Sequence, residues 1–319
     1  MNNYSKLAKN LITNQITDWE MAKKNYMDLG NVQVKEILFD NFTIKVQFNP
    51  GRIRSSAAKV DAKTLSERPC FLCKKNRPKE QSEITILEKY DILINPFPIF
   101  EQHLTISDIN HVPQLLKGRM GEMLEISRLL DEFTVFYNGP KCGASAPDHF
   151  HFQAGNNDFL PIGTGYANLI KKYGKLLKSK FCELWAVDDS IRKILIFSSD
   201  NAQDIENEFN RVYELLEKRS GNSEEPAMNI LTRYVEGRFL IIMFLRGAHR
   251  PWQYTAEGDA NILVTPASVE FGGILITPLE KDFLKIAKED IIDIFKQTSI
   301  HKELFDEFLL EIQQNSSHI

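Results

Sequence analysis

Between residues 149 and 153 the chain reads His-Phe-His-Phe-Gln, so polar and aromatic side chains alternate strictly. A period of two is typical of a β-strand, in which successive side chains point to opposite faces of the sheet. The two histidines and the glutamine are therefore expected to share one face, while both phenylalanines enter a core. A loop of small residues at 139–148 comes directly before. The pattern predicts a strand that carries an active site on one face.

Composition narrows the class of protein. The 319 residues are 43% hydrophobic and 26% charged, which is typical of a globular protein with a buried core. A net charge of −4 provides no basic surface for nucleic acid, and no apolar stretch reaches the ~20 residues of a membrane helix. The N-terminal segment lacks the apolar core of a signal peptide, so we expect a cytoplasmic location. Four cysteines in a chain of this length argue against a disulfide scaffold.

Hydrophobic periodicity predicts an α+β protein with antiparallel sheets, flanking helices and two similar halves. We expect an N-terminal helix over 1–30, an active half at 31–160 and a degenerate half at 161–319. Strands are expected at 34–50 (a hairpin turning at Asp40-Asn41), 90–97, 101–108, 133–138, 149–153, 182–189, 192–199 and 228–247 (a hairpin turning at Glu236-Gly237). Helices are expected at 112–133, where Pro113 suits a first turn, at 202–220, and twice near the C-terminus. The second half lacks the paired histidines of the first.

Cys70 and Cys73 form a CxxC pair that allows three interpretations. A redox pair of the thioredoxin type would follow a parallel strand and begin a helix, a context that this sequence lacks. A zinc site needs two further ligands, for which His103, His111 and His149 are available in the same half. Two buried thiols without a metal are the third interpretation, and the spacing alone does not choose between it and zinc.

His151 lies at the centre of the alternating run, and a neutral imidazole is a competent nucleophile near pH 7. Attack on an α-phosphorus would give a histidyl-nucleotide, provided that the other ring nitrogen is hydrogen-bonded and donors surround the phosphate oxygens. The preceding loop offers donors through the Ser145 hydroxyl and through backbone made accessible by Gly139 and Gly143. The alternative is that two alternate histidines line a solvent-exposed face without any chemical role.

Four segments, in this order along the chain, resemble motifs of the histidine-triad superfamily and, within it, of the galactose-1-phosphate uridylyltransferase branch. CFLCKKN at 70–76 is similar to the zinc motif, LINPFPIF at 93–100 to the nucleotide-contacting segment, and SDINHVPQLL at 107–116 to a segment with a zinc-binding histidine. FYNGPKCGASAPDHFHFQ at 136–153 resembles the signature around the nucleophile. Its aromatic residues, which replace prolines of the uridylyltransferases, look more like phosphorylases of GDP-hexoses or diadenosine tetraphosphate.

The resemblance implies a role for each matching residue. His151 matches the nucleophile, and Gln153 matches a phosphate-binding glutamine that hydrolases of the superfamily replace by a third histidine. A closed, structural zinc site is implied with Cys70, Cys73, His111 and His149 as ligands, His103 being a substitute for His111. The other matches are Ser145 and Asn138 at the phosphate site and its loop, Asn95 and Phe97 at the base and ribose, Arg52 and Arg54 at the second phosphate, and Glu270 at the hexose hydroxyls.

These features predict a nucleotidyltransferase that acts through a covalent histidyl-nucleotide on an NDP-sugar or a dinucleoside polyphosphate. Phosphate or a sugar phosphate is the expected acceptor, with Lys141 near the phosphates and His249 and Arg250 as walls for its sugar. Two alternatives are a hydrolase of the same superfamily, which Gln153 disfavours, and a nucleotide-binding module without turnover, which needs no His151. The base, the sugar and the oligomeric state do not follow from the sequence, and a homodimer is left open.

Overall fold

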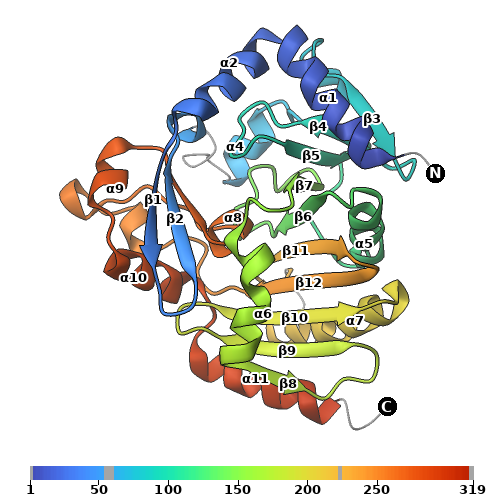
Figure 1. Ribbon diagram of the computed structural model, residues 1–319, viewed down its shortest axis with the longest axis vertical. Helices are drawn as coiled ribbons and strands as arrows, with labels where there is room; N and C mark the ends of the chain where they lie inside the picture. The colour runs from blue at the N-terminus through green and yellow to red at the C-terminus, as the bar shows by residue number, and fades with distance from the viewer. Residues whose placement is uncertain (1–2, 54–60, 222–224, 316–319) are drawn as a thin grey trace.

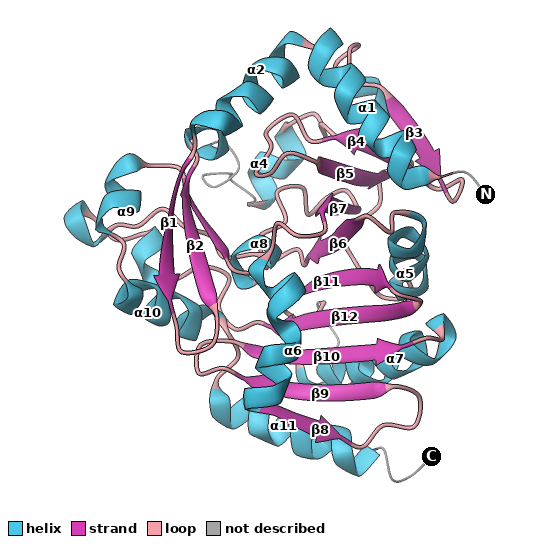
Figure 2. Cartoon of the chain, in the orientation of Figure 1, coloured by secondary structure: helices cyan, strands magenta, loops and turns pink. Residues whose placement is uncertain are grey.

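A ten-stranded antiparallel sheet forms the frame on which the other elements pack (Figure 1). The structure is a computed structural model that describes residues 3–53, 61–221 and 225–315. The strand order is β3-β4-β5-β7-β6-β11-β12-β10-β9-β8, so strands from the two halves of the sequence meet at the centre. The predicted α+β class, with antiparallel sheets and flanking helices, is confirmed (Figure 2).

The two halves of the sheet repeat one topology. The first consists of β3 (Glu83–Ile86), β4 (Tyr90–Ile94), β5 (His103–Asp108), α5 (Met120–Leu129), β6 (Phe133–Asn138) and β7 (His151–Asn156). The second consists of β8 (Gly174–Leu177), β9 (Glu183–Asp188), β10 (Lys193–Ser199), α7 (Ala202–Arg219), β11 (Met228–Val235) and β12 (Arg238–Leu245). In each half the fifth strand inserts between the third and the fourth, and β6 pairs with β11 where the halves join. The predicted repeat of organisation is confirmed.

The remaining elements cover the faces and ends of this sheet. They are α1 (Tyr4–Asp18), α2 (Glu20–Asp28), β1 (Gln33–Leu38), β2 (Thr43–Phe48), α4 (Ala62–Glu67), α6 (Pro161–Tyr173), α8 (Ser268–Phe271), β13 (Ile274–Thr277), α9 (Glu280–Lys285), α10 (Lys288–Thr298) and α11 (Lys302–Asn315). Short 3₁₀ helices span Leu29–Asn31, Pro50–Arg52, Lys74–Asn76, Trp252–Tyr254 and Gly258–Ala260. The hairpin β1–β2 forms a separate sheet with β13, which runs parallel to β2.

Two hydrophobic cores lie on opposite faces of the large sheet. One packs α1, α5, α7 and α11 against the face that carries the buried side chains of Phe150 and Phe152. The other packs the small sheet, α6, α8 and α10 against the opposite face of the second half. There β12, the repeat of β7, turns Ile242 and Phe244 into the core. The second half is therefore packed with apolar side chains on the face where the first half carries its polar residues.

Three predicted elements differ from the structure. The helix expected over 1–30 is two helices, because the backbone is extended at Trp19 (φ −115°, ψ 103°) and α2 starts after it. The helix expected at 112–133 begins only at Met120, since Gly118 takes a left-handed φ of 73°. The histidine strand begins at His151, so the residues before it lie in a loop.

Both predicted hairpin turns are present. At Glu236-Gly237 the φ values are 52° and 80°, the left-handed conformations that a type I′ turn requires. The four-residue strands β3, β8 and β13 and the helices α4, α6, α8 and α9 were not predicted. The expected domain boundaries after residues 30 and 160 stay predictions. The large sheet is continuous across the two halves. None of the helices in the described part of the chain combines the length and hydrophobicity needed to cross a membrane.

Candidate functional site

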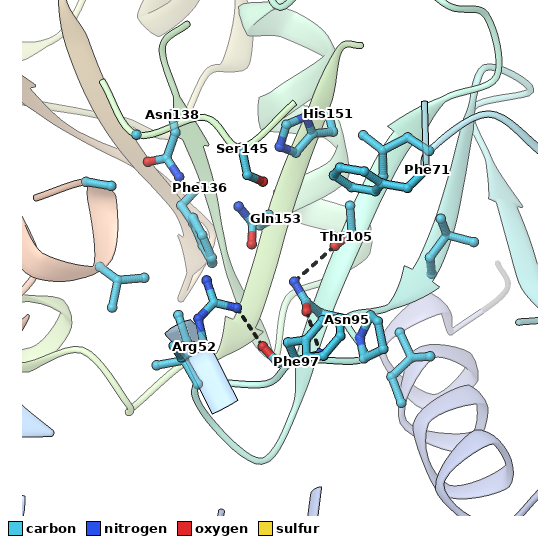
Figure 3. A pocket seen from close by; sticks show the side chains of 18 of the residues that line it. Arg52, Phe71, Asn95, Phe97, Thr105, Phe136, Asn138, Ser145, His151 and Gln153 are labelled. Carbon is cyan, nitrogen blue, oxygen red and sulfur yellow. Dashed lines mark hydrogen bonds between the residues drawn. The ribbon is translucent and has the colours of Figure 1, made fainter. Parts of the chain in front are cut away.

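A pocket of about 560 Å³ opens on the polar face of the first half, over β5, β6 and β7 (Figure 3). Its floor carries the side chains of Thr105, Phe136, His151 and Gln153. The second half adds Thr265, Ala267, Val269 and Glu270, and the bend between α1 and α2 adds Trp19 and Met21. Segments from three distant parts of the sequence thus enclose one site.

His151 is held in a single orientation at the start of β7. Its backbone N–H donates to Oε1 of Gln114 (2.8 Å), and its carbonyl accepts from Nε2 of the same amide (2.9 Å). Ring Nδ1 lies 2.9 Å from the carbonyl oxygen of His149 and must carry a proton, because a carbonyl only accepts. Burial lowers the pKa of His151 to about 4, so the ring is neutral near pH 7. A neutral ring with a free Nε2 lone pair, lining a pocket, can act as a nucleophile.

The second half of the chain fastens the loop between β6 and β7. Oδ1 of Asn138 accepts from Nδ2 of Asn229 and from the backbone N–H of Ser268, both at 2.9 Å. The same Asn229 amide donates to the carbonyl of Cys142 at 2.8 Å. Asn138 is therefore placed as the support of this loop, at the edge of the pocket that it also lines.

Close packing fixes the same loop at Gly143. Its φ is 94°, and a Cβ atom there would lie 2.5 Å from Cβ of Ala267, so a side chain does not fit. The contact positions Ser145, whose hydroxyl lies between His151 and Gln153 in Figure 3. The hydroxyl of Ser145 and the amide of Gln153 are two donors beside the candidate nucleophile.

Arg52 reaches the pocket from the opposite side. Its guanidinium donates to the carbonyl of Phe97 (2.6 Å), and burial lowers its pKa to about 10, so it stays charged at neutral pH. Arg54, expected beside it, lies outside the described residues. Lys141 is exposed on the β6–β7 loop and does not line this pocket.

Asn95 and Phe97 line the pocket, as do the apolar side chains of Trp19, Met21 and Leu93. Oδ1 of Asn95 accepts from the backbone N–H of Phe97 (3.0 Å), and its Nδ2 donates to Oγ1 of Thr105 (3.3 Å). Much of the hydrogen-bonding capacity of Asn95 is thus used to shape the turn that presents Phe97.

Glu270 enters the pocket from α8. One of its carboxylate oxygens accepts from the backbone N–H of Ala267 (2.9 Å), and burial raises its pKa to about 6. The positive charges of Arg52 and Arg246 oppose that rise. His249 and Arg250 do not line the pocket; burial, with the charges of Arg250, Arg246 and Lys141, lowers the pKa of His249 to about 4.

Four potential metal ligands converge next to the pocket: Cys70, Cys73, His111 and His149. Their ligand atoms all lie within 4.8 Å of one another, and Sγ of Cys70 is 3.3 Å from Nδ1 of His149. A tetrahedral zinc site with two sulfur and two nitrogen ligands has edges of about 3.3–3.8 Å. The donor set and its spacing therefore fit zinc, whereas His103 is fully buried beside Gln153 and does not belong to the cluster.

Backbone and side-chain contacts orient the two histidines of this cluster. Nε2 of His149 donates to the carbonyl of Asp108 (2.8 Å), so its Nδ1 lone pair faces the thiols. Nδ1 of His111 faces Sγ of Cys73 (3.3 Å). Asp148, between His149 and the loop, pairs with Arg68 (2.7 Å), a residue that also lines the pocket.

Three residues at the site were not predicted in these positions. Gln114 lies in a segment expected to be helical, and no local pattern distinguishes it. Trp19 was expected inside a continuous helix. His103 was considered only as a metal ligand. Period-two alternation nevertheless places it with Thr105 on the same face of β5, the strand that pairs with β7.

A family model described as a domain of unknown function, DUF4922, matches residues 11–156. A comparison with curated proteins gave no match. The crystal structure of yeast Ap4A phosphorylase Apa2 in complex with Ap4A shares 16% identity and a TM-score of 0.60, over 92% of this chain and 97% of that chain. The structure of the same enzyme in complex with AMP shares 15% identity and a TM-score of 0.59, over 92% of this chain and 96% of that chain. A GalT-like protein from Arabidopsis thaliana gives 14% identity and a TM-score of 0.38, over 84% and 99%.

The overlap with the phosphorylase extends over nearly the whole of both chains, although few residues are identical. At such identity the similarity shows a shared fold. The histidine-triad-like fold expected from the four motifs is therefore confirmed.

Proposed function

We propose that this protein, built on a histidine-triad-like fold, transfers nucleotidyl groups through a covalent intermediate on His151. One observation carries the proposal: Nδ1–H of His151 is held by the His149 carbonyl, which leaves the Nε2 lone pair available at the pocket. The same hydrogen bond stabilises the positive charge that develops on the ring when Nε2 forms a bond to phosphorus.

In the first half-reaction, the Nε2 lone pair attacks the α-phosphorus of the donor. The N–P bond forms as the bond to the bridging oxygen breaks, and the leaving group departs with that electron pair. In the second half-reaction, an oxygen of the acceptor attacks the same phosphorus and the N–P bond breaks, which returns the pair to Nε2. Nδ1 keeps its proton in both steps, so the imidazole needs no general base.

The remaining roles follow from position. Ser145 and Gln153 donate to the non-bridging oxygens, and Arg52 supplies positive charge, to which we add Arg54 from the sequence. Lys141 does not line the pocket and receives no role in the transfer. Asn138 supports the loop, Phe97 and Asn95 contact the base and ribose, and Glu270 accepts from sugar hydroxyls. His151, Gln153 and Ser145 are thus the proposed catalytic residues.

Zinc is the metal that we assign to Cys70, Cys73, His111 and His149. Four protein ligands leave no open position, so the ion would join the loops around residues 70, 111 and 149 and take no part in the transfer. Because His149 also supplies the carbonyl that orients His151, this cross-link would hold the nucleophile in place.

The fold shared with a phosphorylase crystallised with Ap4A and with AMP supports a dinucleoside polyphosphate as the donor. An NDP-sugar is the alternative donor that the motif resemblance implies. An amide such as that of Gln153 cannot transfer protons at neutral pH, so water should be a poor acceptor compared with phosphate or a sugar phosphate.

The acceptor can be tested on the isolated nucleotidyl-protein. We expect slow release of nucleotide in buffer alone and release faster by 100-fold or more, on the order of 3 kcal/mol in barrier, when inorganic phosphate or a hexose phosphate is added. Release that is rapid in buffer and unaffected by either acceptor would establish a hydrolase instead.

A further inference from the structure

We propose that His103 is a positioning residue, which locks the side-chain amide of Gln153 with its N–H groups toward the nucleotidyl group. This inference rests on the proposed function and gives a role to the one histidine of the first half that neither the metal cluster nor the nucleophile uses.

The tautomer of His103 is set by the backbone. The N–H of Ile99 donates to ring Nδ1 at 3.3 Å, and a backbone N–H can only donate, so Nδ1 carries a lone pair. Burial, reinforced by the charge of Arg52, lowers the pKa of His103 to about 3. The ring is therefore neutral, and its single proton is on Nε2.

That proton in turn sets the orientation of Gln153. Nε2 of His103 lies 2.9 Å from Oε1 of Gln153, the group that can accept from an N–H. Asn95 also approaches Nε2, at 3.4 Å, but its amide donates to Thr105. With its oxygen occupied by His103, Gln153 presents its two N–H groups elsewhere. In Figure 3 its nitrogen lies on the side of Ser145 and its oxygen on the side of Asn95.

The surroundings of His103 keep its ring from moving. The side chain is fully buried, and the ring of Phe100 packs against it with centroids 4.4 Å apart. The hydroxyl of Tyr26 on α2 donates to the backbone carbonyl of His103 at 3.1 Å. On the sheet, Gln153 pairs with Thr105, two residues along β5 from His103, so the contact runs diagonally between adjacent strands.

The consequence is that Gln153 always turns the positive end of its amide dipole toward the pocket. If the amide of Gln153 rotated by half a turn, its oxygen lone pairs would face the anionic oxygens of the nucleotide and repel them. A free amide would populate both orientations, whereas His103 permits only the donating one. Its loss should therefore lower the rate of nucleotidyl transfer more than the affinity for the donor, because the charge on those oxygens is redistributed in the transition state.

Two variants separate this role from a structural one. In His103→Asn the side-chain oxygen can still accept from Ile99, but nothing replaces Nε2. In His103→Gln a terminal N–H₂ can still donate to Gln153, but the acceptor for Ile99 is lost. We expect His103→Asn to slow transfer about 10- to 100-fold at a similar KM, the loss typical of one hydrogen bond to a charged group, and His103→Gln to stay within a few-fold of wild type. If His103→Gln were instead the slower variant, the role of His103 would be only to accept the hydrogen bond from Ile99.

A double-mutant cycle adds a second readout. In a Gln153→Leu background the amide is absent, so His103→Asn should cost little further activity. Full additivity of the two losses would overturn the inference, because it would mean that the residues act independently.

The tautomer itself can be measured without any substrate. Long-range ¹H–¹⁵N spectra of the imidazoles should show His103 protonated on Nε2 throughout pH 5–8. Protonation on Nδ1 would overturn the inference even if nucleotidyl transfer is established. If the wild type forms no nucleotidyl-protein, the proposed function fails, and the spectra still decide whether His103 orients Gln153.

Discussion

Three histidines of the first half show how a single backbone contact decides what an imidazole can do. In His151 a carbonyl takes the Nδ1 proton, so Nε2 is left as a nucleophile. In His149 another carbonyl takes the Nε2 proton, so Nδ1 faces the two thiols. In His103 a backbone N–H occupies Nδ1, so Nε2 becomes a donor to the pocket glutamine. Residue type is the same in all three, and the chemistry differs because the backbone partner differs.

Glu225 allows a prediction about pH. It lies at the start of the segment before β11, where it accepts from the hydroxyl of Tyr137 (2.5 Å), from that of Tyr213 (3.4 Å) and from the backbone N–H of Leu116. Burial raises the pKa of Glu225 from 4.5 to about 7. The folded protein thus binds this proton more tightly than the unfolded chain. Its contribution to stability is complete below pH 4.5 and is lost as the pH rises through about 7.

Replacing Glu225 by Gln should remove this dependence. Between pH 5 and pH 8 we expect the free energy of unfolding of the wild type to fall by about 2–3 kcal/mol relative to that of Glu225→Gln. Denaturant titrations at several pH values measure the difference. Glu214→Gln, an exposed change on α7, should keep the wild-type profile. Parallel profiles for wild type and Glu225→Gln would contradict the prediction.

Secondary-structure elements were predictable where a period was long and unbroken. The alternation in β7 and the 3.6-residue pattern of α7 each gave the correct type, and the polar face of β7 located the pocket. The segment at 112–119 was not predictable, because its loop is stabilised by distant partners: Gln114 binds both backbone groups of His151. The bend at Trp19 likewise has no local signal, since a helix pattern continues on both sides of it.

The four ligand residues lie outside helices and strands, in three segments around residues 70–73, 111 and 149, which a bound zinc ion would cross-link. Cys70→Ser should therefore lower the melting temperature by about 5 °C or more. It should also reduce the zinc content below the one ion per chain expected for the wild type. Thermal unfolding with metal analysis measures both. Cys182→Ser, a change to a half-buried thiol of the second half, is the matched control and should keep zinc. A wild-type protein without zinc, as stable as Cys70→Ser, would leave the two thiols as ordinary buried cysteines.

Equivalent strands of the two halves have different roles in the molecule. The first half provides the polar face of β7, and the second half provides a packed wall and the contacts that hold the β6–β7 loop. Sequence periodicity could reveal the repeat and the missing histidines, but not that Asn229 and Ser268 bind Asn138. Such contacts join residues about a hundred positions apart, and nothing local specifies them.

Asn229 tests this dependence of one half on the other. It is fully buried, donates to Asn138 and Cys142 and accepts from Arg246, but it does not line the pocket. Asn229→Ala should cost about 2–4 kcal/mol of stability, because it leaves buried partners unsatisfied, and reduce transfer about 10-fold or more. Thr232→Ala changes a buried polar residue of the same strand that bonds Ser127 instead, so it should cost stability without the same loss of activity. Equal losses of activity in both variants would mean that the β6–β7 loop does not depend on Asn229.

The central claim is that His151 carries the nucleotidyl group. Intact-protein mass spectrometry after incubation with dinucleoside polyphosphates and NDP-sugars tests it most directly. The wild type should gain the mass of one nucleoside monophosphate from at least one donor, and peptide mapping should place the group on His151. His151→Asn, in which an amide can still donate to the His149 carbonyl, should gain none. A wild type that stays unmodified by every donor, or a His151→Asn variant that is modified like the wild type, would contradict the account.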